Sequence, residues 1–115
     1  MTDRDYMAEA LVLARQAAQA GEVPVGCVIV RQGQIVGRGR NRRETDKTAL
    51  GHAEIDAIRQ ACETLGGWRL WECTLYVTLE PCPMCAGAIV NARIPRVVYG
   101  AKDTKSGACG SVCDL

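Results

Sequence analysis

The sequence predicts a single α/β domain built on a mixed four-stranded sheet, and three observations support this fold class. The chain has 115 residues, of which 48% are hydrophobic and 23% charged, with four prolines, a composition typical of one packed globular domain. Helical and strand-like apolar patterns alternate in the order α-β-β-α-β-α-β. The first two strands follow each other directly, whereas the later strands are joined through helices, so a hairpin is expected beside parallel strands. We take residues 1–115 as one domain.

The first half begins with an amphipathic helix. Apolar residues recur at helical spacing from Asp3 to Ala20, and Gly21 suits the position just after a helix end. Two β-rich runs, 25–30 and 34–38, follow, and the three residues between them suit a short hairpin loop. Residues 41–50 are polar and aperiodic, which predicts a surface loop.

The second half alternates helices with strands. Apolar residues from about His52 to Leu65 predict a helix that ends at paired glycines, and 74–79 is the next strand. A third helix is expected from Pro81 until Pro95 forbids its continuation, and 96–99 is the fourth strand. In strand-helix-strand units each helix starts at the carboxyl edge of the preceding strand. The helices that open near His52 and Cys82 should therefore begin at one edge of the sheet.

Two short motifs begin these helices and predict a metal site. His52, the only histidine, stands in His-Ala-Glu, and Cys82 and Cys85 form Cys-x-x-Cys. The N-terminus of a helix favours thiolates, and two thiolates with one imidazole can hold Zn²⁺ while leaving a fourth position for water. Glu54 follows His52 by two residues, roughly 200° around an ideal helix, so we expect it beside that water as the proton carrier and not as a ligand.

His-x-Glu followed by Pro-Cys-x-x-Cys is the established signature of the zinc deaminases. The likeness extends over nearly the whole chain, because five further segments resemble the bacterial tRNA-specific adenosine deaminase family: Glu22–Gly26, Gly51–Glu54, Trp68–Leu70, Thr74–Cys82 and Met84–Ala88. The resemblance implies a three-layer α-β-α cytidine-deaminase-like fold and a homodimer, while the lack of a recognisable signal peptide or membrane helix predicts a cytoplasmic protein. It also implies zinc-dependent conversion of the wobble adenosine in a tRNA anticodon to inosine, with release of ammonia.

The same resemblance implies roles for individual residues by matching position. Asn41 corresponds to the asparagine that holds the flipped nucleotide, Val25 to a pocket wall, and Ala53 to a backbone donor to the base. Asp103 corresponds to the acidic residue near the neighbouring nucleotides. Members of the family continue past the position of Leu115 into a last strand and a C-terminal helix, so we expect this chain to lack both.

Other functions remain open from the sequence. A deaminase of free guanine, of cytosine or of a nucleoside would share the metal motif, and a non-catalytic zinc module that binds RNA belongs to a different class. Formal net charge is +1, so bulk charge does not argue for a nucleic-acid partner. No apolar stretch suits a membrane helix and no signal peptide is recognisable, so we expect no membrane partner.

Several residues outside the motifs have both a structural and a functional interpretation. Seven cysteines without an export signal indicate reduced thiols, and Cys27, Cys62 and Cys73 are expected to be small buried residues. A second metal or redox site at Cys109 and Cys113 is the less favoured interpretation. Trp68 and Trp71 are expected to pack, although aromatic rings can also stack on bases. The arginines around Asn41 suit either a solvated loop or phosphate contacts: Arg38, Arg40, Arg42 and Arg43.

Overall fold

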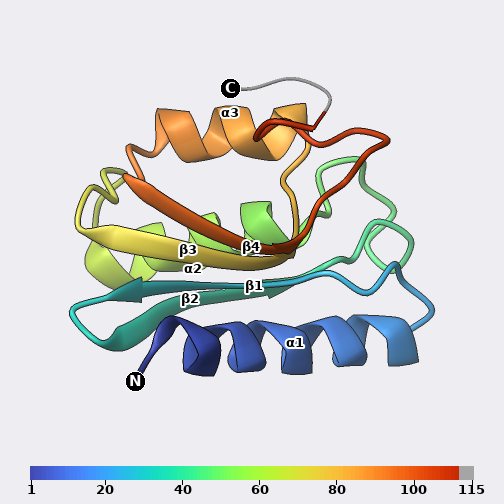
Figure 1. Ribbon diagram of the computed structural model, residues 1–115, viewed down its shortest axis with the longest axis horizontal. Coiled ribbons are helices and arrows are strands. Elements are labelled where there is room, and N and C mark those ends of the chain that lie inside the picture. Colours follow the sequence, from blue (N-terminus) through green and yellow to red (C-terminus); the bar gives the residue numbers. More distant parts are fainter. Residues whose placement is uncertain (112–115) are drawn as a thin grey trace.

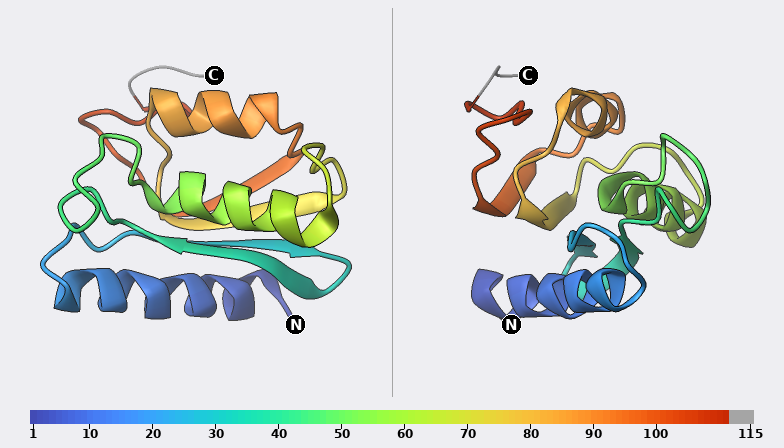
Figure 2. Two further views of the ribbon diagram at one scale, coloured as in Figure 1. Left: turned by 180° about the vertical axis from the view of Figure 1, so that it is seen from behind. Right: turned by 90° about the vertical axis from the view of Figure 1, so that its right-hand side faces the viewer.

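The computed structural model describes residues 1–111 and confirms the predicted order of elements. They are α1 (Asp3–Gln19), β1 (Gly26–Arg31), β2 (Gln34–Arg40), α2 (Ala53–Leu65), β3 (Cys73–Leu79), α3 (Pro83–Asn91) and β4 (Arg96–Ala101). The four strands form one sheet in the order β2-β1-β3-β4. Helix α1 covers one face, and α2 and α3 cover the other, which gives the expected three-layer α-β-α arrangement (Figures 1 and 2).

The sheet is mixed as predicted. Strand β1 pairs antiparallel with both β2 and β3, and β3 pairs parallel with β4. The hairpin turn between β1 and β2 consists of Gln32 and Gly33, which both have positive φ, at 51° and 78°. Two consecutive positive φ angles are what a tight turn needs to match the twist of the flanking strands.

Glycines allow the helices to approach the sheet closely. A Cβ atom on Gly26 of β1 would lie 2.0 Å from the Ala10 carbonyl oxygen of α1, and one on Gly39 of β2 would lie 2.1 Å from the Ala53 carbonyl oxygen of α2. No side chain fits at such distances. These contacts hold the first turn of α2 against the end of β2, next to the edge where the predicted motifs lie.

Both later helices begin at predicted motif residues. His52 is the N-cap of α2 and Cys82 is the N-cap of α3, and each has extended backbone dihedrals. Helix α3 ends at Asn91, earlier than the prediction that it would continue until Pro95. The chain turns instead at Arg93, whose φ is 66° and whose guanidinium donates hydrogen bonds to the carbonyls of Val90 and Asn91. The side chain thereby adds to the backbone hydrogen bond that the Arg93 N–H already donates to the Val90 carbonyl, and it gives the Asn91 carbonyl at the helix end a partner.

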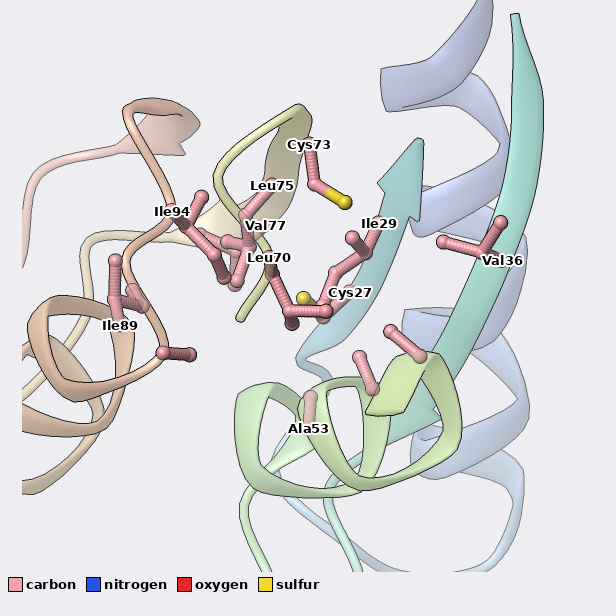
Figure 3. Packing of buried hydrophobic residues seen from close by; sticks show 13 residues of the cluster. Cys27, Ile29, Val36, Ala53, Leu70, Cys73, Leu75, Val77, Ile89 and Ile94 are labelled. Atoms are coloured by element: carbon pink, nitrogen blue, oxygen red, sulfur yellow. The ribbon is translucent and has the colours of Figure 1, made fainter. Parts of the chain in front are cut away.

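The main core lies between the sheet and helices α2 and α3 (Figure 3). Cys27 and Cys73 are at most 1% exposed within it, which confirms that these two cysteines are small buried residues. Cys62 is only partly buried and packs against the edge of the cluster. The expectation that the tryptophans pack is wrong, since Trp68 and Trp71 are 50% and 63% exposed. The guanidinium of Arg69 lies over both indole rings, so the rings contact a cation and are not buried in the core.

Within residues 1–111 no helix is long and apolar enough to cross a membrane.

Candidate active site

The predicted motifs meet in a pocket at one edge of the sheet. The start of α3, the 41–52 loop and the 102–111 loop gather at the right-hand end of the molecule in Figure 1. The pocket is lined by Val23, Val25, Asn41, Arg43, His52, Ala53, Glu54, Leu79, Glu80, Cys82, Asp103 and Ser106. Seven of the eight residues predicted for the site are among them, and the eighth, Cys85, is fully buried behind the pocket.

His52, Cys82 and Cys85 form a group that could hold a metal ion. Their ligand atoms all lie within 4.8 Å of one another, and no other such group occurs in the part of the chain that the structure describes. Nδ1 of His52 lies 3.6 Å from the Cys82 sulfur and 3.4 Å from the Cys85 sulfur. Nδ1 therefore is the imidazole nitrogen that faces both thiols, a detail that the sequence could not supply.

These distances fit a tetrahedral zinc ion. Zinc bonds of about 2.3 Å to sulfur and about 2.05 Å to nitrogen, at tetrahedral angles, separate the two ligand atoms by about 3.6 Å. Both measured separations lie close to that value. Three protein ligands would leave the fourth position of a bound zinc ion to water, which is the arrangement of catalytic zinc sites.

Burial opposes the ionisation of Cys85 in the protein alone. Burial, together with the negative charges of Glu54 and Cys82, raises the pKa of the Cys85 thiol well above its usual range. The helix start is expected to favour thiolates, and at Cys85 burial acts in the opposite direction. A metal ion bound at the group would favour the thiolate, because a coordinating thiol is deprotonated.

Glu54 lies in the pocket beside the donor group without belonging to it. Its carboxyl is hydrogen-bonded to the Cys85 thiol, and the residue is only 4% exposed. Burial raises the pKa of Glu54 to about 6, while the hydrogen bonds it accepts act in the opposite direction. His52 is the extended N-cap of α2 and not a helical residue, so an ideal helix angle does not describe how the two side chains separate. The change of backbone direction at the cap lets both face one pocket.

Asn41 and Asp103 face the pocket from two different loops. Asn41 is 7% exposed, its N–H donates to the Val25 carbonyl, and its Oδ1 accepts a hydrogen bond from the Arg43 N–H. The carboxylate of Asp103 accepts hydrogen bonds from the backbone N–H of Lys105 and from the Ser106 hydroxyl. Loop-internal hydrogen bonds thus orient both side chains.

Two buried glutamates near the pocket were not predicted from the sequence. Glu80 is 2% exposed and lines the pocket, and Glu22 is 6% exposed beneath the 41–50 loop. A charged residue immediately before Pro81-Cys82 was the available signal for Glu80, because charged groups are rarely buried without several partners. Of the possible second site, Cys109 lies near the carboxylate of Glu80 and Cys113 lies outside the described residues.

Comparison with known proteins is consistent with this geometry. The MafB19-like deaminase family matches residues 1–113. A tRNA-specific adenosine deaminase of Bacillus subtilis (strain 168) is 51% identical over 113 residues, which cover 98% of this chain and 70% of the relative.

Two solved structures have the same fold. A structure from work on A-to-I editing by tRNA:A34 deaminases at the wobble position is 51% identical, with a TM-score of 0.91 over 94% of this chain and 83% of that one. A guanine deaminase from Bacillus subtilis is 41% identical, with a TM-score of 0.88 over 96% of this chain and 71% of that one. The chain therefore belongs to the MafB19-like deaminase family and is related to the tRNA-specific adenosine deaminases at 51% identity over nearly its whole length.

Proposed function

We propose that this protein is a zinc-dependent hydrolase that deaminates the wobble adenosine of a tRNA anticodon to inosine and releases ammonia. The observation that carries the proposal is the donor group of His52, Cys82 and Cys85 beside buried Glu54, in a chain 51% identical to proteins named tRNA-specific adenosine deaminase. By the same likeness we propose that it works as a cytoplasmic homodimer.

The residues of the site have two different chemical roles, metal binding and proton transfer. Zinc held by His52, Cys82 and Cys85 would activate a water for attack on C6 of adenine. Glu54 accepts the proton that this water loses and delivers it to the exocyclic nitrogen, which leaves as ammonia. Burial raises the pKa of this carboxyl to about 6, which suits a group that both accepts and returns a proton.

The substrate nucleotide must be unstacked to reach this pocket. A base inside a duplex cannot enter a pocket at the edge of a sheet, whereas a nucleotide of a loop can be splayed out. Ala53 is the first residue of α2, where the backbone N–H has no acceptor within the helix and can donate to the base. We assign Asn41 and Val25 to the sides of the bound nucleotide and Asp103 to the neighbouring nucleotides.

An arginine-lined depression beside the pocket supports an RNA substrate. Arg38, Arg40, Arg42 and Arg59 line it, with Asp56 and Glu63 as its acidic members. Successive residues from 40 to 43 line the two hollows in turn. Arg40 and Arg42 line the depression, and Asn41 and Arg43 line the pocket. Arginines so placed can contact the phosphates of the loop whose base occupies the pocket.

Deamination of free guanine is the second candidate, favoured by the 41% identity to a guanine deaminase over 96% of this chain. The deciding experiment measures ammonia release from an anticodon hairpin, the same sequence held as duplex, free adenosine, guanine and cytosine. We expect the hairpin to react fastest, because contacts to its flanking nucleotides supply binding energy that free bases lack. Faster turnover of a free base would contradict the tRNA assignment, and absence of turnover with every substrate would favour a non-catalytic zinc module.

Metal content and assembly are tested separately. We expect about one zinc per chain in the purified protein, because this donor set suits that ion, and less than half an equivalent would contradict the metal assignment. Sedimentation equilibrium tests the homodimer, and a monomeric mass at assay concentration would exclude it as the working form.

A further inference from the structure

The carboxylate of Glu80 accepts several hydrogen bonds from one loop, residues 103–111. Its Oε1 accepts a hydrogen bond of 3.1 Å from the Asp103 N–H, and its Oε2 accepts bonds of 2.9 Å from the Cys109 N–H and 3.1 Å from the Ser111 N–H. The Ser111 hydroxyl donates to Oε1 as well. All four donors come from residues 103–111, although Glu80 itself directly follows β3.

The chain is shaped to fit around this carboxylate. A Cβ atom on Gly107 would lie 2.5 Å from the Glu80 carboxyl carbon, so a side chain there would displace the loop. The N–H of Ala108 donates to the Pro81 carbonyl at 2.8 Å, which holds the loop to the segment that leads into Cys82. Residues 102–108 contain no helix and no strand. Their backbone conformation therefore depends strongly on contacts with side chains such as that of Glu80.

A carboxylate suits these donors better than other side chains. An ionised carboxylate only accepts hydrogen bonds, and its two oxygens can take all four of these donors. Such bonds to a charged group are stronger than those between neutral groups. A glutamine would present an amide N–H₂ to backbone N–H groups, so part of the set would be lost.

The loop held in this way contributes to the pocket. Asp103 and Ser106 both line the pocket, and Asp103 provides one of the N–H groups bound by Glu80. We propose that Glu80 is a positioning residue which fixes the 103–111 loop, and through Asp103 sets the affinity for the RNA nucleotides that flank the target adenosine. The assignment of substrate rests on the function proposed above, whereas the tether itself does not.

Hydrogen exchange tests the tether without any assay of activity. In Glu80→Gln we expect amide exchange to accelerate at least about tenfold within 103–111, and to stay unchanged within 41–50. Glu22→Gln is the matched variant, because Glu22 accepts hydrogen bonds from the Glu44 and Thr45 N–H groups of the other loop, and it should show the reverse pattern. Unchanged exchange within 103–111 in Glu80→Gln would overturn the proposal.

Steady-state kinetics on the anticodon hairpin test the consequence for substrate. In Glu80→Gln with full zinc content we expect KM to rise about tenfold while kcat changes much less, because contacts to flanking nucleotides contribute mainly to binding. Glu72→Gln is the control, since Glu72 is exposed and pairs with Arg31 at the other end of β1. A fall in kcat at unchanged KM would overturn the positioning role.

Two further comparisons complete the test. Ser111→Ala is the alternative variant in case Glu80→Gln folds poorly. It removes only the hydroxyl donor, so KM should rise by a smaller factor than in Glu80→Gln. An unchanged KM in Ser111→Ala would count against the proposal. Wild-type turnover of the hairpin is measured first. If it is absent, both the proposed function and the assignment to RNA fail, while hydrogen exchange still decides whether Glu80 holds the loop.

Discussion

Glu54 lies beside the three metal-binding candidates, but replacing it is expected to have a different effect from replacing one of them. The carboxyl group contacts the Cys85 thiol yet is outside the donor group, and it is almost completely buried. Its position therefore suits proton transfer, whereas Cys85 can supply a ligand atom. This difference separates catalysis from metal binding at the scale of single residues.

Replacing Glu54 by alanine should abolish turnover and leave the zinc in place. General acid–base groups contribute typically 10²–10⁴-fold, so we expect a loss in kcat of about that size. Inosine formation and metal analysis on the same preparation provide the measurement, with Cys85→Ala as the variant that should lose zinc. Loss of zinc in Glu54→Ala would show that Glu54 is a ligand.

At the scale of elements, glycines decide how closely the helices approach the sheet. Gly39→Ala should destabilise the protein by about 1–3 kcal/mol or more, because its Cβ would meet the Ala53 carbonyl oxygen at 2.1 Å and push α2 away from β2. Gly87→Ala is the control, since Gly87 is exposed within α3 and a Cβ there meets no atom within 4 Å. It should stabilise by about 0.5–1 kcal/mol. Urea unfolding compares both, and equal effects would contradict the packing argument.

The first turn of α1 is joined to two strands through Asp3. Its carboxylate accepts hydrogen bonds from the Tyr76 hydroxyl of β3 and from the Arg96 guanidinium of β4. These contacts, with Arg96 the larger cause, hold the pKa of Asp3 well below its ordinary value of 3.8. The ionised form is therefore favoured by folding, and this contribution is present above about pH 4 and lost as pH falls below it.

Asp3→Asn should accordingly weaken the pH dependence of stability in acid. We expect the wild-type free energy of unfolding to fall more steeply than that of the variant between about pH 4 and pH 2. Urea unfolding at several pH values measures this, with Asp46→Asn in the exposed 41–50 loop as the control. Parallel curves for wild type and Asp3→Asn would exclude the contribution of this contact.

At the scale of the whole molecule, RNA binding must rely on local charge. The formal net charge is only +1, while four arginines gather in the depression beside the pocket. Each phosphate that the protein no longer neutralises should reduce the slope of log affinity against log salt by about 0.7–0.9. Arg38→Gln with Arg59→Gln should therefore flatten that slope for an anticodon hairpin. Arg31→Gln, at the far end of β1, should leave the slope unchanged. Equal slopes in the wild type, the double variant and Arg31→Gln would exclude the depression as a phosphate site.

The order of elements and the members of the group of His52, Cys82 and Cys85 could be predicted from local sequence patterns. Hydrophobic periodicity and turn residues are local signals, so the three helices, the hairpin and the parallel connection to β4 could be predicted, with bounds within about two residues except at the end of α3. The spacing of His52, Glu54, Cys82 and Cys85 is also local, and strand-helix-strand geometry was enough to place both motifs at one edge of the sheet.

The ionisation, the orientation and the loop contacts of the site, in contrast, depend on residues that are far apart in the sequence and meet only in the folded chain. Burial raises the pKa of the Cys85 thiol, Nδ1 of His52 is the nitrogen that faces the sulfurs, and Glu80 binds a loop more than twenty residues further along the chain. The exposure of the tryptophans and the early end of α3 at Arg93 likewise depend on neighbours that periodicity does not specify. The physical reason is common to all: desolvation and hydrogen bonding depend on which distant groups surround an atom, and that is known only once the chain is folded.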